Sequence, residues 1–269
     1  MQGFYYELTV TPKERVDFFS SLLLELSGSA LEEKNSSLIL RSEEELDTIE
    51  WAVKEASNKL GIEIETSLEK KDNEDWISKY KSSIQPVEVS SFYIRPEWED
   101  KKENLTDIII NPALAFGSGH HESTSSCITL IDKIVKESNT VLDVGCGSGI
   151  LGICASKKGA VVDICDTDEL AVSSAKENFA LNSATFSDAW SGSANSTTKT
   201  YDIVIANIIA DIIIMINKDL KSRTKESGYL ILSGIIDKYF DKVREKFSDF
   251  ELIEDIHKGE WHTMLLKKI

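Results

Sequence analysis

Three glycines at alternate positions, Gly145, Gly147 and Gly149, follow a predicted strand over 140–144 and precede a predicted helix over 149–158. Glycines permit a tight turn and allow a ligand to approach bare backbone. The free N–H groups at the start of the helix favour an anionic group. This order of residues therefore predicts a ligand site where the strand ends.

The spacing of the glycines and two nearby aspartates indicate which class of ligand this loop would bind. A dinucleotide loop of the form G-x-G-x-x-G needs a glycine at position 150, where Ile150 stands. Asp143 precedes the loop, and Asp166 closes the next predicted strand, where a carboxylate can accept hydrogen bonds from ribose hydroxyls. The pattern favours S-adenosylmethionine. A dehydrogenase and a glycine turn without a ligand are the alternatives.

Two further segments carry polar groups that could act on a substrate. Asn207 follows a predicted apolar strand, on the rim where α/β sheets bind ligands, although an asparagine there could equally cap a helix. The segment Asn111–Thr124 contains glycines, hydroxyls and two of the four histidines. It predicts either a lid over the cofactor or a flexible lead into a helix capped by Ser123 or Thr124.

The elements that would position these groups alternate in type from Thr140 onward, which indicates a Rossmann-like, doubly wound parallel α/β sheet. The expected strands are 140–144, 160–165, 201–206 and 228–233, and the expected helices are 149–158, 168–181, 209–221 and 236–247. Two last strands, 250–257 and 261–267, lack an intervening helix and must pair antiparallel. The Ser-, Thr- and Asn-rich segment 187–200 predicts a mobile loop.

The first 69 residues follow a different pattern. Their hydrophobic periodicity predicts the order β-α-β-β-α-β, which is typical of a small ferredoxin-like α+β domain. Polar residues over 70–81 predict a linker, and residues 82–269 form the larger predicted domain.

Charge and cysteine usage limit the partners and cofactors. The chain has 46 acidic and 30 basic residues, a net charge of −16, which disfavours nucleic acid and suits a basic protein partner or simply solubility. The four cysteines have no C-x-x-C spacing and no histidine pair beside them, so we expect no metal site. Reduced core cysteines indicate the cytoplasm, and no segment predicts a signal peptide or a membrane span.

Several segments together resemble the family of methyltransferases that modify large-subunit ribosomal protein L11, the PrmA family. They are Asn111–Thr124, Asp143–Leu151, Asp166–Asp168, Asn207–Ala210, Leu232–Ile235 and Gly259–Trp261. The chain departs from the family pattern at Asn111, Glu122 and Ser123, where the family has Asp, Pro and Thr. The N-terminal domain matches the family's substrate-recognition domain in pattern only.

The resemblance implies a class I S-adenosylmethionine-dependent methyltransferase domain and methylation of lysine side chains and the N-terminal α-amine of free L11. It implies that Asn207 orients the acceptor amine. The implied cofactor contacts are Phe116, Gly117, Thr124, Gly145, Gly147, Asp166 and Asn207. A methyltransferase for another protein or for RNA, and an inactive cofactor-binding module, remain alternatives.

Overall fold

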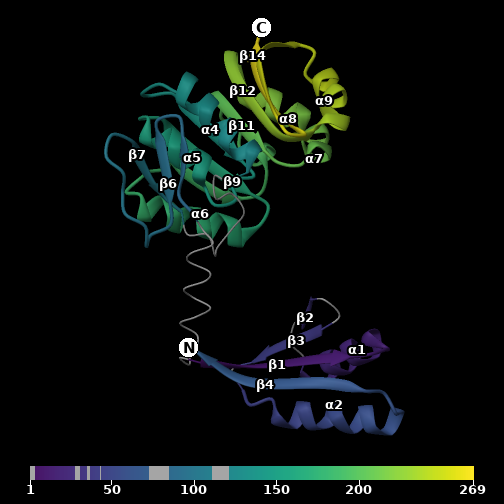
Figure 1. The fold of residues 1–269 in the computed structure, drawn as a ribbon. Coiled ribbons are helices and arrows are strands. Elements are labelled where there is room, and N and C mark those ends of the chain that lie inside the picture. The colour runs from purple at the N-terminus through teal and green to yellow at the C-terminus, as the bar shows by residue number, and fades with distance from the viewer. Residues whose placement is uncertain (1–3, 28–30, 35–36, 43, 73–84, 111–120) are drawn as a thin grey trace. The chain divides into compact units, whose positions relative to one another are not determined.

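A computed structural model describes the chain except residues 1–3, 28–30, 35–36, 43, 73–84 and 111–120. The chain divides into two compact units, residues 1–83 and residues 84–269 (Figure 1). The first unit has one sheet and one hydrophobic core, and the second has two sheets and two cores, so each unit is described separately below. Among the described residues, no helix combines the length and apolar character needed to cross a bilayer.

The N-terminal unit has the element order that the sequence predicts. Its elements are β1 (Phe4–Pro12), α1 (Val16–Ser27), β2 (Leu31–Lys34), β3 (Ser37–Ser42), α2 (Asp47–Leu60) and β4 (Ile64–Asp72). The four strands form one antiparallel sheet in the order β2-β3-β1-β4. Residues 70–72 of the expected linker belong to β4, and residues 73–81 lie outside the described residues.

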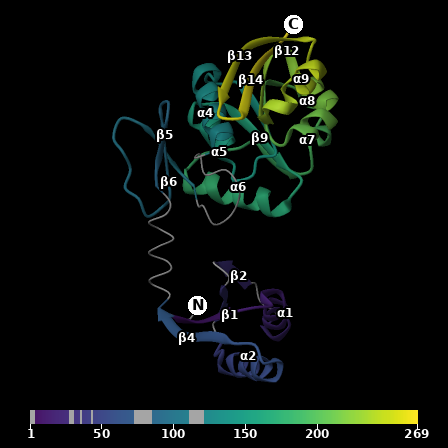
Figure 2. The ribbon, with the colours of Figure 1, turned by 45° about the vertical axis from the view of Figure 1, so that its right-hand side comes forward.

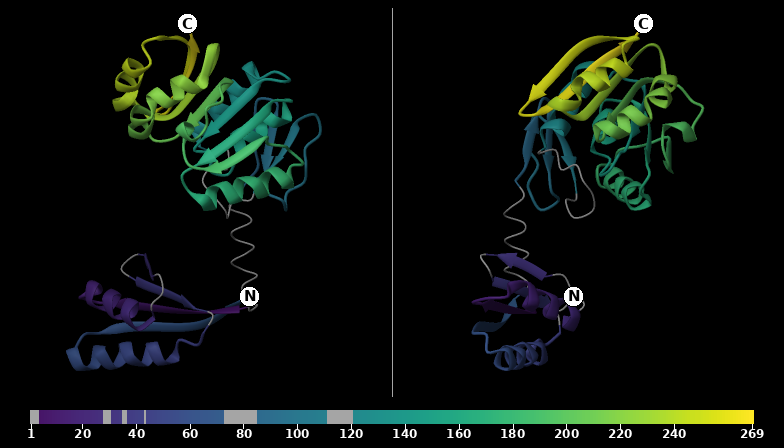
Figure 3. Two further views of the ribbon diagram at one scale, coloured as in Figure 1. Left: turned by 180° about the vertical axis from the view of Figure 1, so that it is seen from behind. Right: turned by 90° about the vertical axis from the view of Figure 1, so that its right-hand side faces the viewer.

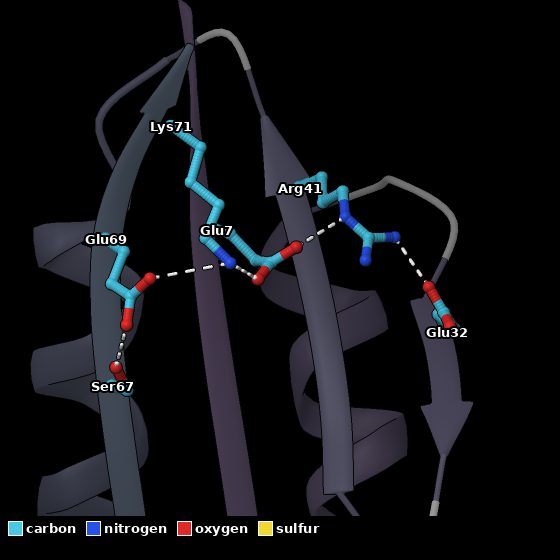
Figure 4. A network of polar contacts seen from close by, with 6 residues as sticks. All are labelled: Glu7, Glu32, Arg41, Ser67, Glu69 and Lys71. Atoms are coloured by element: carbon cyan, nitrogen blue, oxygen red, sulfur yellow. Dashed lines mark hydrogen bonds and ion pairs between the residues drawn. The ribbon is translucent and has the colours of Figure 1, made fainter. Parts of the chain in front are cut away.

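Alternation along the strands gives this sheet two different faces. Leu8 and Val10 of β1 point to the side of α1 and α2, where they are fully buried with Phe19 and Val53. Glu7 lies on the other face, which Figure 4 shows to carry a row of charged side chains. One sheet face therefore forms the core, and the opposite face is polar.

An ion-pair network spans all four strands on the polar face (Figure 4). Arg41 lies 2.7 Å from the Glu7 carboxylate and 2.6 Å from that of Glu32. Lys71 pairs with Glu7 and also with Glu69. Burial raises the pKa of Glu7, but Lys71 and Arg41 outweigh it and hold this pKa below its ordinary value.

The second unit contains a seven-stranded sheet in the order β10-β9-β8-β11-β12-β14-β13. Its strands are β8 (Thr140–Val144), β9 (Val161–Asp166), β10 (Asp188–Ser191), β11 (Tyr201–Asn207), β12 (Thr224–Ile236), β13 (Phe250–Lys258) and β14 (Trp261–Lys268). The first five strands in this order run parallel to one another. The last two strands of the chain, β13 and β14, pair antiparallel as the sequence predicts, and β14 is also antiparallel to β12 (Figure 2). The chain moves outward from β8 to β10 and then returns to the other side of β8, which makes the gap between β8 and β11 the topological switch point.

Helices cover both faces of this sheet (Figure 3). One face packs against α4 (Glu122–Ile134), α5 (Ile150–Lys157) and α6 (Glu169–Leu181); the other packs against α7 (Ala210–Met215), α8 (Asn217–Arg223) and α9 (Phe240–Lys246). Neighbouring strand residues alternate between these cores, so Val141 joins the first and Leu142 the second. A short 3₁₀ helix, η2 (Asp237–Tyr239), joins β12 to α9.

A small sheet of β5 (Val87–Val89), β6 (Phe92–Arg95) and β7 (Thr106–Ile109) packs into the first of these cores. The buried side chain of Asn182, just after α6, binds β7, an edge strand of this small sheet. Its carbonyl oxygen accepts from the Ile109 N–H at 2.7 Å, and its amide nitrogen donates to the Ile109 carbonyl at 2.6 Å. This side chain thus imitates a neighbouring strand and satisfies both backbone groups of Ile109.

The expectation of a loop over the whole of 187–200 was wrong. Residues 188–191 form β10, and Ala194–Ser196 form a 3₁₀ helix, η1. The Trp190 indole donates to the Ser193 carbonyl at 3.2 Å, and Lys199 pairs with the buried Asp163 at 2.9 Å. Tertiary contacts therefore override a composition that is typical of loops.

Replacing Asn182 with alanine should destabilise the second unit by roughly 2–4 kcal/mol, because both backbone groups of Ile109 lose their partner. Urea unfolding, followed by circular dichroism, measures the change. Glu177→Ala, on the exposed side of α6, is the control and should change stability by less than about 0.5 kcal/mol. Equal stabilities of the two variants would contradict the assigned role.

Candidate functional site

A cavity of about 730 Å³ lies at the carboxyl ends of β8, β9 and β11, beside the switch point. Its lining includes Gly145, Gly147, Asp166 and Asn207, four of the residues that the sequence singled out. A cavity of this volume is in the range that holds small organic ligands and cofactors. The structure thus gathers at one opening residues that belong to three different strand ends.

The glycine turn packs tightly and carries left-handed backbone. Gly145, Gly147 and Gly149 have φ values of 72°, 51° and 80°. The N–H groups of Gly145 and Cys146 both donate to the Cys165 carbonyl, at 2.8 and 3.0 Å, which ties the turn to β9. A Cβ on Gly145 would overlap the Ile208 side chain. Only glycine fits there without displacing the Ile208 side chain.

Asp166 is held by the backbone around it. Its Oδ2 accepts the Gly147 N–H at 3.0 Å, and its Oδ1 accepts the Asp168 N–H at 3.1 Å. These bonds fix the half-buried carboxylate at the cavity wall and leave each oxygen with a lone pair. A fixed carboxylate with spare acceptor capacity can receive two neighbouring hydroxyls, such as those of a ribose.

Asp143 lies beneath the turn and is 1% exposed. Its Oδ2 accepts the Gly152 N–H from the first turn of α5 at 3.0 Å, while its Oδ1 has no hydrogen-bond partner among the described residues. Burial raises the pKa of this carboxyl to about 7, and the nearby Asp166 adds to the rise. Burial thus favours the neutral form of Asp143, so Asp166 is the acid that gives the cavity its negative charge.

Asn207 is oriented by a residue from a distant helix. Its amide nitrogen donates to the Thr124 hydroxyl at 3.2 Å. Thr124 is 1% exposed and does not line the cavity; it lies behind Asn207. The structure therefore brings these two predicted residues together but gives Thr124 the position of a support.

The segment after Asn207 is clamped between two glycines. Gly145 contacts the side chain of Ile208, and Gly234, with a φ of 80°, lies against its backbone so closely that a Cβ would overlap it. The Ile208 N–H also donates to the Ser233 carbonyl at 3.2 Å. The exits of β8 and β11 are thus packed against the last part of β12 around Ile208.

His121 and Trp261 form part of the cavity wall, and their contact was not predicted from the sequence. Their rings meet edge to face with centroids 4.7 Å apart, and both line the cavity. His121 caps α4, since its Nδ1 accepts the Ser123 N–H at 3.3 Å. The motif around Trp261 was the available signal, but only the fold brings these two residues together.

An apolar wall along α7 was not predicted from the sequence. Ile209 and Met215 line the cavity and are 67% and 69% exposed, and Ile212 lies between them in the helix. Large apolar side chains exposed at a cavity edge are typical of binding surfaces. Gly192 and Ser193, from the segment expected to be a loop, line the cavity too.

The cavity's charge discriminates between cofactor classes. Among the described lining residues, Asp166 is the one acid, and none is lysine or arginine. A pyrophosphate would gain from a basic side chain, whereas a cationic cofactor with a ribose gains from the carboxylate. The lining therefore fits S-adenosylmethionine. Phe116 and Gly117 lie outside the described residues.

Comparisons with known proteins agree with this geometry. The family model "Ribosomal protein L11 methyltransferase (PrmA)" matches residues 15–269. The chain belongs to this family. A ribosomal protein L11 methyltransferase of Nitratiruptor sp. is 52% identical, with 99% of this chain and 97% of that protein covered. The corresponding protein of Campylobacter fetus subsp. fetus is 48% identical, with coverage of 99% and 98%.

A solved structure is similar to this PrmA-family chain. The ribosomal protein L11 methylase of Lactobacillus delbrueckii subsp. bulgaricus has a TM-score of 0.65 and 30% identity; the match covers 69% of this chain and all of that one. The family, the methyltransferase class and the cofactor S-adenosylmethionine, all predicted from the sequence, are thereby confirmed. The individual site residues stay predictions.

Substituting alanine for Gly145 should weaken S-adenosylmethionine binding about tenfold or more, because its Cβ would displace Ile208. Gly61→Ala is a matched control: Gly61 has a φ of 69°, close to the 72° of Gly145, but open space where its Cβ would be. Calorimetric titration with the cofactor compares the two. Equal affinities would show that the overlap does not shape the site.

Proposed function

We propose that this methyltransferase transfers methyl groups to amino groups of ribosomal protein L11, namely lysine side chains and the N-terminal α-amine. The observation that carries the proposal is the shared cavity of Asp166 and Asn207 at the switch point. A ribose-binding carboxylate and an amine-orienting amide on one opening suit cofactor and acceptor bound side by side. The names of the relatives support L11 as the substrate.

For the cofactor, the proposal assigns Asp166 to the ribose hydroxyls and the Gly145 and Gly147 backbone to close contact with the ligand. Asn207 borders both the cofactor and the acceptor, with Thr124 supporting it from behind. Phe116 and Gly117 are proposed to cover the cofactor, as the family resemblance implies. Bound S-adenosylmethionine supplies a methyl group on a positively charged sulfur. An amine nitrogen can attack the carbon of this methyl group in line with its bond to sulfur.

The protein's task in this reaction is to position and to desolvate. The Thr124 hydroxyl accepts from the Asn207 amide nitrogen and so leaves the amide oxygen to accept an N–H from the substrate amine. The amine must be neutral to offer its lone pair, and burial against the apolar wall of Ile209 and Met215 would lower its pKa. After transfer, the nitrogen loses one proton, which water can accept.

For substrate recognition, we propose that residues 4–72 act as a ferredoxin-like docking domain. Residues 1–70 contain 15 acids and 7 bases, and Glu65 and Glu69 are exposed on the polar face of the sheet. A basic substrate protein would be attracted to such a surface. The proposed substrate is the free L11 protein in the cytoplasm, with no nucleic acid in the contact.

Asn207→Ala should lower kcat for L11 methylation roughly 100-fold while changing the cofactor Kd far less, because the acceptor amine loses its orienting oxygen. Thr124→Val should give a smaller loss of kcat, since it keeps the shape but removes the hydroxyl that holds Asn207. The assay uses labelled S-adenosylmethionine, purified L11 and mass spectrometry. Wild-type protein that leaves L11 unmodified but methylates another substrate would refute the substrate proposal.

Replacing Glu65 and Glu69 together with glutamine should raise KM for L11 about two- to tenfold, with kcat unchanged, because two exposed charges are removed from the docking face. The increase should shrink at high salt. Glu55→Gln, on α2 at the opposite face, is the control and should leave KM unchanged. A KM that shifts equally in both variants would contradict docking at this face.

A further inference from the structure

We propose that Asp237, His257 and His262 bind a divalent transition-metal ion, with Zn²⁺ as the expected occupant. The three side chains come together beside the hairpin of β13 and β14, and none of them lines the cofactor cavity. Two imidazoles and one carboxylate form a ligand set typical of zinc and its neighbours. This proposal does not depend on which protein the enzyme methylates.

The hairpin aligns the two histidines. His257 of β13 and His262 of β14 are direct partners in the antiparallel register. Their rings stack in parallel, with centroids 4.0 Å apart and an interplanar angle of 7°. Side chains of directly paired residues on one sheet face lie close together, so both rings can offer a nitrogen to the same point.

The carboxylate reaches this point from a separate element. Asp237 begins η2, and its N–H donates to the Glu260 carbonyl at 3.0 Å, which anchors it to the hairpin turn. Its Oδ1 lies 2.9 Å from Nε2 of His257 and 3.1 Å from Nε2 of His262. All three ligand atoms lie within 4.8 Å of one another.

These separations are close to those of a metal site. Tetrahedral zinc with bonds of about 2.0–2.1 Å holds its ligand atoms roughly 3.3–3.4 Å apart. To admit the ion, the carboxylate would retreat by a few tenths of an ångström from each histidine, and the two stacked rings would tilt so that the ion lies in the plane of both. Asp237 has a side-chain exposure of 62%, so it can make this movement, and solvent can supply the fourth ligand.

Asp255 gives the cluster a feature that often accompanies metal-bound histidines. Its Oδ2 lies 2.9 Å from Nδ1 of His262. A proton on Nδ1, donated to this carboxylate, leaves the Nε2 lone pair directed at the metal position. The Phe240 ring lies 4.3 Å from the same imidazole, which is only 12% exposed, so its orientation is restricted from both sides.

The ion would fix a segment next to the cofactor site. His262 follows Trp261, whose ring lines the cavity and contacts His121. A metal bridge would tie η2 to both strands of this hairpin, and so restrain the backbone that carries Trp261. The sequence prediction of no metal site rested on the cysteines, which have no C-x-x-C spacing and no histidine pair beside them. His257 and His262 are separated by four residues, a spacing that zinc sites use, but only the folded chain brings Asp237 to them.

The test uses the full-length chain without an affinity tag, stripped of metal with a chelator and titrated with ZnCl₂ by calorimetry. One equivalent should bind, and His257→Ala and His262→Ala should each weaken binding at least about tenfold. Asp255→Asn should weaken it less than either. Asp241→Asn, which removes a nearby acid of α9 outside the cluster, is the control and should bind as the wild type does.

A second measurement does not depend on variants. Co²⁺ added to the stripped protein should give visible d–d absorption, which one equivalent of Zn²⁺ should abolish. The four cysteines are buried and should not compete for the ion in the folded chain. Absence of saturable binding to the wild type, or undiminished binding to the His257→Ala, His262→Ala double variant, would overturn the proposal. The first result would leave only a hydrogen-bonded cluster.

Discussion

The packing of Ile208 between Gly145 and Gly234 is the constraint on which the site depends. The exits of β8 and β11 and the last part of β12 meet at this residue, and a single Cβ at Gly145 or at Gly234 would overlap it. The overlap matters because interiors are close-packed, so a displaced backbone must move its neighbours. Asn207 precedes Ile208, so the clamp also sets where the amide enters the cavity.

Around this clamp, the site is polar in only a few places. Asp166 is fixed by two backbone N–H groups, and Asn207 by one hydroxyl. The remaining wall is largely glycine backbone and apolar side chains, including Ile209 and Met215. Such a lining holds a cofactor by shape and a few directed bonds. Apolar walls of this kind would also help to exclude water from the proposed transfer to a neutral amine.

The N-terminal unit has an apolar and a charged face on the two sides of one sheet. Its core uses one face of a four-stranded sheet, which leaves the other face available for charge. Glu7 in the middle of that face is neutralised by Arg41 and Lys71, while the acids toward the edge remain exposed. Internal pairing thus stabilises the sheet, and the outer charges can act on a partner.

The sequence by itself determined the parts of this protein that are local. The glycine turn, Asp143 and Asp166 belong to one strand-turn-helix-strand unit, in which spacing along the chain fixes position in space. The order of strands and helices could also be predicted from the sequence, because hydrophobic periodicity indicates the type of element and its buried face. The family also followed, because its motifs are short and continuous.

Only the tertiary structure decided the contacts between distant segments. Thr124 supports Asn207 from behind, and His121 meets Trp261, because α4 and β14 pack beside the central strands. Residues 188–191 form a strand because they pair with β9, and a 3₁₀ helix follows at Ala194–Ser196. The composition of this segment does not indicate either element. The pairing of His257 with His262 depends on the register of a hairpin. Register is set by packing across strands, which one-dimensional spacing does not contain.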